Sequence, residues 1–322
     1  MEEIKLNENY EKFPDNFFAP KEVKYGNHSF RNFLVRFDNL YEIYRYLNSK
    51  PVINKNIWTR ESDLASITGN YKQAGIPYEK ALEDLKNFNE EGYDEFADLV
   101  SELSHLKAGY KHEYETHRTL YGGFLNIPAY SAGDPLCYEV QRRVKRPKFI
   151  NVYAALSYPW FTTKNQVLHR AVIMMSIIHA LEKNGYNVNF ETFQLSEKEH
   201  ELVYMAINIQ QYGERTNLQT LYKTNCHVEF FRRLLFRVLE TMPVTDDWSD
   251  GYGHTCDAPM VKEILKIGDD ALYFGTRTEL RIRGDNLESD FKNCLEVLDL
   301  QNRFDVREIT DEMQQKVKSI IK

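Results

Sequence analysis

The chain has 322 residues, a formal net charge of −7, 42% hydrophobic residues and 28% charged residues. These values are typical of a globular protein, and the negative charge argues against a general nucleic-acid coat, which needs a cationic footprint. Aromatic residues make up 13% of the chain, so many rings must be buried or must cover a partner.

The four cysteines and the N-terminus bear on the compartment. The cysteines are far apart and lack a C-x-x-C spacing, which predicts reduced thiols rather than a disulfide framework or a zinc ribbon. The N-terminus is acidic and polar, and no apolar run approaches the roughly 20 residues that cross a bilayer. We therefore expect a soluble, cytoplasmic protein with no membrane partner.

The first half of the chain divides by composition into three segments. Residues 1–30 are polar and irregular, which predicts an extended lead-in. Residues 31–121 are predicted to be mainly helical, because apolar side chains recur at three- and four-residue spacing in the runs that begin at Leu40, Tyr78 and Phe96. Residues 122–147 are rich in glycine and proline and predict a loop-rich junction.

Residues 148–322 alternate between strand and helix patterns. The predicted strands are 149–156, 188–193, 202–209 and 271–274, and the predicted helices are 166–184, 218–242 and 287–298. Such alternation favours an α/β fold with an open, mostly parallel, Rossmann-like sheet and helices on both faces. We expect this α/β domain to follow the mainly helical N-terminal region.

Ligands of open α/β sheets bind beyond the carboxyl ends of the strands, which directs attention to the loop 157–165. Ser157, Thr162, Thr163 and Lys164 precede a helix N-terminus, where backbone N–H groups can receive an anion. The loop has no glycine for close backbone approach, and Trp160 makes it bulky. Capping and packing are therefore the favoured roles for its polar residues.

Residues 246–257 are the segment richest in chemically active side chains. Carboxylates and an imidazole at Asp246, Asp250, His254 and Asp257 form a candidate divalent-metal set. Their spacing fits no known metal loop, so a solvated glycine-rich turn is the favoured interpretation. The rings of Trp248 and Tyr252 indicate that this loop contacts a partner.

Basic residues cluster before the first predicted strand, at Arg142, Arg143, Lys145 and Arg146. They could bind phosphates, although a solvated rim suits the acidic chain better. The sequence has no P-loop, G-x-S-x-G, H-E-x-x-H or kinase motif. The residues therefore lean towards a protein that is not an enzyme.

Three stretches carry a resemblance to known families. The run Phe149–Pro159 with His169–Phe193 resembles the first strand, helix and second strand of a von Willebrand factor A-like domain. Together with Ala132–Pro135 and Gly251–Gly253, it is more closely similar to an uncharacterised family of bacteriophage-encoded proteins. That resemblance implies a phage protein that acts in the host cytoplasm.

The same resemblance implies a degenerate metal site. In von Willebrand A domains the first strand ends in D-x-S-x-S, which holds a divalent metal. Here Ala155 and Pro159 replace the aspartate and the second serine, and only Ser157 remains. A hard cation is not held without the carboxylate.

The leading hypothesis is therefore a non-catalytic protein-interaction scaffold without a cofactor. It would bind another protein, from phage or host, through the loops 157–165 and 246–257. The alternative is a metal-assisted enzyme that acts on nucleotides or nucleic acid through the segment 246–257. A third hypothesis is a local nucleic-acid binder that uses residues 142–148. The sequence sets no oligomeric state.

Overall fold

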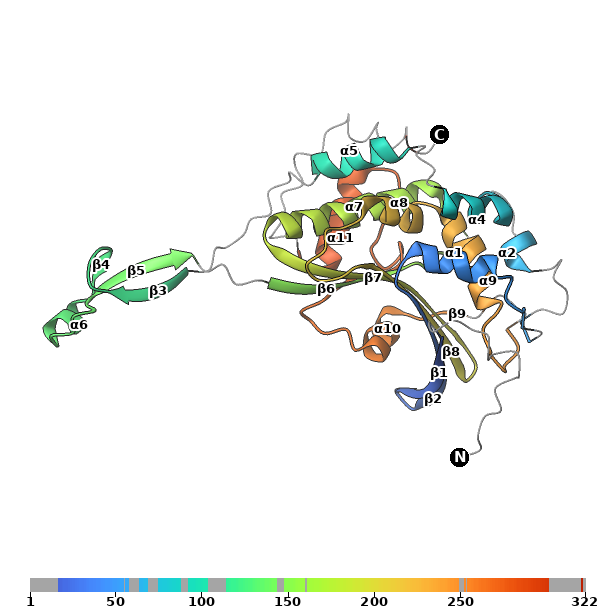
Figure 1. Ribbon diagram of the computed structural model, residues 1–322, viewed down its shortest axis with the longest axis horizontal. Helices are drawn as coiled ribbons and strands as arrows, with labels where there is room; N and C mark the ends of the chain where they lie inside the picture. Colours follow the sequence, from blue (N-terminus) through green and yellow to red (C-terminus); the bar gives the residue numbers. More distant parts are fainter. Residues whose placement is uncertain are drawn as a thin grey trace.

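The protein is described from a computed structural model. It defines residues 17–54, 56–57, 64–68, 75–87, 92–103, 114–143, 148–159, 161–248, 252, 254–300 and 320. The main body is built on a seven-stranded sheet (Figure 1). Its strands are β1 (Phe17–Tyr25), β2 (His28–Phe37), β6 (Lys148–Ala155), β7 (Tyr186–Lys198), β8 (Glu201–Gln210), β9 (His254–Thr255) and β10 (Leu272–Phe274).

The strands run in the order β1-β2-β8-β7-β6-β10, and the short β9 pairs with β7. β6 is parallel to β7 and to β10, and β2 is parallel to β8. The β1–β2, β7–β8 and β7–β9 pairs are antiparallel. The predicted α/β fold with an open sheet is confirmed, and the sheet is mixed because hairpins join β1 to β2 and β7 to β8.

Helices cover both faces of this sheet, as predicted, but very unequally (Figure 1). One face carries α1 (Leu40–Asn48), α2 (Ala65–Thr68), α4 (Tyr78–Lys86), α5 (Tyr93–Leu103), α7 (Lys164–Lys183), α8 (Leu218–Asn225), the π-helix η3 (Phe230–Leu235), α9 (Phe236–Leu239) and α11 (Leu287–Val297). The other face carries α10 (Ala258–Leu265), whose Met260 and Val261 close a second, smaller core.

The helix α7 is the centre of the larger core. Fourteen of its twenty residues are buried, and it packs against α5, α8 and α11 as well as the sheet. Each fully buried Leu, Ile or Met side chain stabilises the fold by roughly 1.5–3 kcal/mol. The strand–helix–strand unit β6–α7–β7, expected from the apolar pattern, is confirmed. None of the helices within the described residues is long and apolar enough to span a membrane.

The N-terminal part differs from the prediction of a lead-in followed by a mainly helical region. Residues 17–37 form the hairpin β1–β2, which adds two strands to the main sheet. Gly26 has φ +56° in the two-residue turn, where a hairpin requires a left-handed residue. Phe33, Val35 and Phe37 then alternate into the core, which is the strand period rather than the helix period. The predicted boundary at residue 31 therefore falls inside a strand.

The predicted loop-rich junction is also regular over its described part. Residues 114–143, which we call the arm, form a separate three-stranded antiparallel sheet of order β3-β5-β4. Its elements are β3 (Tyr114–Thr119), β4 (Phe124–Leu125), α6 (Ile127–Ser131) and β5 (Tyr138–Arg143), drawn beyond the end of β6 in Figure 1. Gly123 lies so close to the β5 backbone that an added Cβ would be 2.0 Å from the Glu139 carbonyl oxygen. Gly123 thus permits close contact between β4 and β5.

The predicted single helix over 218–242 is interrupted. α8 ends at Asn225, and the chain then continues into η3 and α9. The Asn225 side chain accepts a hydrogen bond from Arg170 at 3.4 Å. Periodicity did not reveal this break, because no glycine or proline marks it and the apolar residues continue on both sides.

Candidate functional site

The loop before α7 is used for capping and packing, as the sequence favoured. Thr163 and Gln166 form a reciprocal capping box, in which Gln166 N donates to Thr163 Oγ1 and Thr163 N donates to Gln166 Oε1 at 2.9 Å. Thr162 accepts a hydrogen bond from Arg277 at 3.3 Å. Ser157 is buried, Lys164 is exposed, and Trp160 lies outside the described residues.

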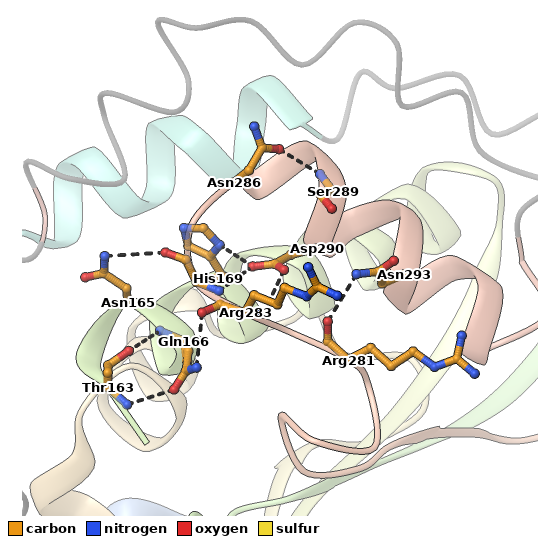
Figure 2. Close-up of polar contacts among 11 residues, drawn as sticks. Thr163, Asn165, Gln166, His169, Arg281, Arg283, Asn286, Ser289, Asp290 and Asn293 are labelled. Carbon is orange, nitrogen blue, oxygen red and sulfur yellow. Dashed lines mark hydrogen bonds and ion pairs between the residues drawn. The ribbon is translucent and has the colours of Figure 1, made fainter. Parts of the chain in front are cut away.

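A network of polar contacts ties the first turns of α7 to the loop before α11 (Figure 2). Gln166 Nε2 donates to the Arg283 carbonyl at 3.1 Å. His169 Nδ1 donates to Asp290 at 2.7 Å, and Asp290 also accepts from the backbone N–H groups of Arg283 and Gly284, each at 2.8 Å. His169 and Asp290 are both buried. The pair therefore fixes the start of α7.

The carboxyl edge of β6 and β10 is the switch point of the sheet, because the chain leaves β6 for β7 on one side and returns to β10 on the other. Ligands of open α/β sheets bind in this position. Here the guanidinium of Arg170 fills it. Arg170 donates to the carbonyl oxygens of Ala155 at 2.7 Å, Phe274 at 2.9 Å and Gly275 at 2.9 Å.

Arg170 is fully buried, and its charge is satisfied by neutral groups. Besides the three carbonyls, it contacts Tyr158 Oη at 3.5 Å and Asn225 Oδ1 at 3.4 Å. No carboxylate forms an ion pair with it within the part of the chain that the structure describes. Burial raises the pKa of Tyr158, so that phenol stays neutral beside the guanidinium. The usual ligand position of this fold is therefore closed by the protein's own side chain.

The rings proposed from the sequence as partner contacts in the segment 246–257 are internal. Trp248 is 0% exposed, and its Nε1 donates to the Glu201 carboxylate at 3.1 Å. Tyr252 is buried, stacks on Phe236 with ring centroids 4.9 Å apart, and donates to Glu240 at 2.8 Å. The assignment of Trp248 and Tyr252 to partner binding is wrong, because their rings and polar atoms are already used inside the fold.

The candidate metal residues have separate roles. Asp246 accepts from the backbone N–H of His200 at 3.2 Å, and Asp257 caps α10 by accepting from Met260 N at 2.9 Å. His254 is exposed on β9, and Asp250 lies outside the described residues. Among the residues that are described, no three His, Cys, Asp or Glu side chains gather in a way that could hold a metal ion.

The candidate nucleic-acid residues fall at the end of the arm. Arg142 and Arg143 are the last two residues of β5. Lys145 and Arg146 lie outside the described residues. The role of this basic run in binding nucleic acid therefore stays a prediction.

The arm carries an exposed apolar surface that the sequence analysis did not identify. Fifteen large hydrophobic side chains are exposed among the described residues, and seven of them lie between residues 120 and 136, each 42–81% exposed. They are Leu120, Tyr121, Phe124, Leu125, Ile127, Tyr130 and Leu136. The available signal was the density of large apolar residues in a stretch otherwise rich in glycine and proline.

Comparison with known proteins establishes the family but no activity. Residues 11–302 match a family described as a domain of unknown function, DUF7192, and the chain belongs to that family. No curated protein and no solved structure matches the chain.

Proposed function

We propose that this protein is a non-catalytic interaction scaffold that binds another protein molecule through the arm. The observation that carries the proposal is the cluster of seven exposed apolar side chains between residues 120 and 136. Large contiguous apolar surfaces are rare on monomers and are typical of interaction sites. The proposal keeps the interaction role expected from the sequence and moves the contact surface from the two loops to the arm.

The arm also has too little core of its own. Ala129 and Cys137 are its buried hydrophobic residues within the described range. A sheet of three strands needs a covered hydrophobic face for independent stability, and chains below about 40 residues seldom supply one alone. A surface that packs on the arm would supply that cover.

We propose that the protein molecule bound at the arm is a second copy of the same chain. The seven side chains expose roughly 900 Å² if a large apolar residue presents about 200 Å² when fully open. A stable interface of standard size buries about 800 Å² on each partner. In a two-fold dimer the same surface of each subunit pairs with itself, and such dimers are the commonest oligomers.

The remaining expectations from the sequence accompany this proposal. We propose a degenerate von Willebrand A-like body that serves as a scaffold, a phage origin and a cytoplasmic location. The absence of a carboxylate at Ala155 and the Arg170 guanidinium at the switch point support the scaffold role. Both features leave the usual ligand position without catalytic groups.

The test is the molar mass of the full chain in solution, measured by light scattering after size exclusion at several concentrations. The wild type should have twice the 38.1 kDa mass of one chain. The combined change Tyr121→Ser, Phe124→Ser and Tyr130→Ser should return it to one chain. These side chains are exposed, so their replacement should leave the fold intact.

A matched control removes exposed hydrophobic residues outside the arm, with Tyr41→Ser, Val52→Ser and Val297→Ser. This control should retain the wild-type mass. A wild-type protein that is a monomer throughout the soluble range would refute the proposal, as would an arm variant that still dimerises.

A further inference from the structure

A cavity of about 230 Å³ opens between α4, the end of α8 and the start of η3, beside the first turn of α7. This is far larger than the roughly 10–15 Å³ that a single water needs. A hollow of about 90 Å³ shares the lining residues Lys164, Tyr222, His227, Glu229 and Ile320 with it. The space suits a small organic molecule.

The polar side of the cavity contains a histidine oriented by a carboxylate. His227 Nδ1 donates to Glu229 Oε1 at 3.0 Å, and the imidazole meets Tyr222 edge-on with ring centroids 4.7 Å apart. Burial acts to raise the pKa of Glu229, but the hydrogen bond and charge of His227, together with Lys164, outweigh it, so this pKa lies below its ordinary value. The ionised carboxylate fixes the ring, and Nε2 of His227 has no hydrogen-bond partner among the described residues.

The charges around the cavity favour an anion. Lys223 is committed to the structure, because its ammonium donates to the Asp84 and Asn87 carbonyls at the end of α4 and burial lowers its pKa. Lys80 and Lys164 also line the cavity, and neither forms an ion pair with any residue that the structure describes. Among the described lining residues, the carboxylates are Asp84 and Glu229, and the basic side chains are Lys80, Lys164, Lys223 and His227, so basic groups outnumber carboxylates.

Much of the rest of the lining is apolar. It includes Ile76, Ala81, Leu85, Phe230 and Leu234. Phe230 and Leu234 belong to η3, and π-helical turns are frequent at functional sites. Lys164 lies in the first turn of α7, which the contacts of Gln166 and His169 anchor to the loop before α11 (Figure 2).

From this arrangement we infer that the cavity binds a small organic oxyanion, either a carboxylate or a phosphate monoester. Lys164 and Lys80 receive the charged group, and His227 binds it as the imidazolium, which donates from Nδ1 to Glu229 and from Nε2 to the ligand. The organic part of the ligand packs on the wall formed by α4 and η3. This site is distinct from the arm and does not depend on self-association.

Calorimetric titration of the full chain with three probes of similar size tests the inference. Phenyl phosphate and benzoate carry the two oxyanions, and benzyl alcohol is their neutral counterpart. At least one anion should bind about tenfold or more tightly than the alcohol, and the tighter anion identifies the ligand class. Failure of both anions to bind, or equal binding of the alcohol, would overturn the inference.

Variants then locate the site. Lys164→Met and His227→Gln should each weaken binding of the tighter anion about tenfold, whereas Lys86→Met, an exposed lysine of α4 outside the cavity, should leave it unchanged. Lys164 is exposed, so its replacement should preserve the fold. If Lys164→Met and His227→Gln both bind as the wild type does, the ligand lies elsewhere and the inference fails. The triple arm variant should bind normally, which separates this test from that of the interaction role.

Discussion

Replacing Arg170 with methionine tests whether its guanidinium closes the switch point of the sheet. The substitution keeps a long side chain on α7 but removes every hydrogen-bond donor. The carbonyl oxygens of Ala155, Phe274 and Gly275 would then lose the donor that now binds them. These acceptors belong to the backbone and remain in place after the substitution.

The expected loss of stability is worked from these three contacts. A buried acceptor without a partner costs roughly 1–3 kcal/mol. Removal of a buried charge returns part of that cost, because the guanidinium no longer has to be desolvated. We therefore expect Arg170→Met to lower the free energy of unfolding by about 3 kcal/mol, a large share of the roughly 5–15 kcal/mol that stabilises most proteins.

Urea unfolding followed by circular dichroism measures this effect. The control is Arg277→Met, whose guanidinium stacks on the Phe161 ring at 4.6 Å near the surface and should contribute less than about 1 kcal/mol. If Arg170→Met unfolds within about 1 kcal/mol of the wild type, the carbonyls do not need the guanidinium. The account of the closed switch point would then be refuted.

Three further substitutions probe other parts of the fold. Glu201→Ala should cost about 3–5 kcal/mol and shift the fluorescence of Trp248, since it leaves the N–H donors of Thr245, Asp246 and the Trp248 indole without their acceptor, at roughly 1–3 kcal/mol each when buried; an unchanged urea midpoint would contradict this. Thr163→Ala should cost about 1 kcal/mol by loss of the α7 cap, with Thr163→Ser retaining most of the stability. Burial raises the pKa of Glu191 above 4.5 in the folded chain, so the folded chain holds this proton more tightly than the unfolded chain. The stability that Glu191 contributes is therefore fully present below about pH 4.5 and is lost as the pH rises through the raised pKa. The unfolding free energy of the wild type should therefore fall relative to Glu191→Gln over that range, and parallel pH profiles of the two proteins would exclude the effect.

Local patterns in the sequence were sufficient for the centre of the fold. The apolar run of β6, the buried face of α7 and its end near Gly185 together specify β6–α7–β7, because they depend on residues close in the chain. The capping role of Thr163 also follows from the four residues that begin α7. The hairpin β1–β2 was not predicted, because residues 1–30 are mostly polar and the alternation of Phe33, Val35 and Phe37 covers only a short stretch.

The candidate site depended on contacts that no local pattern contains. From its residue type and its loop, Trp248 was predicted to contact a partner. In the structure its indole N–H donates instead to the carboxylate of Glu201, 47 positions earlier in the chain. The exposure of the apolar side chains of the arm could not be predicted from the sequence either. An apolar residue gives the same sequence pattern whether its side chain is exposed or covered by another surface.

The sequence by itself determined the α/β class and the central strand–helix–strand unit. Only the tertiary structure showed that Arg170 fills the switch point, because its acceptors at Ala155, Asn225, Phe274 and Gly275 lie 15 to 105 residues away along the chain. Apolar periodicity records which face of an element is buried. It does not record which polar groups from distant parts of the chain form hydrogen bonds there, and those contacts decide whether a ligand site is open or filled.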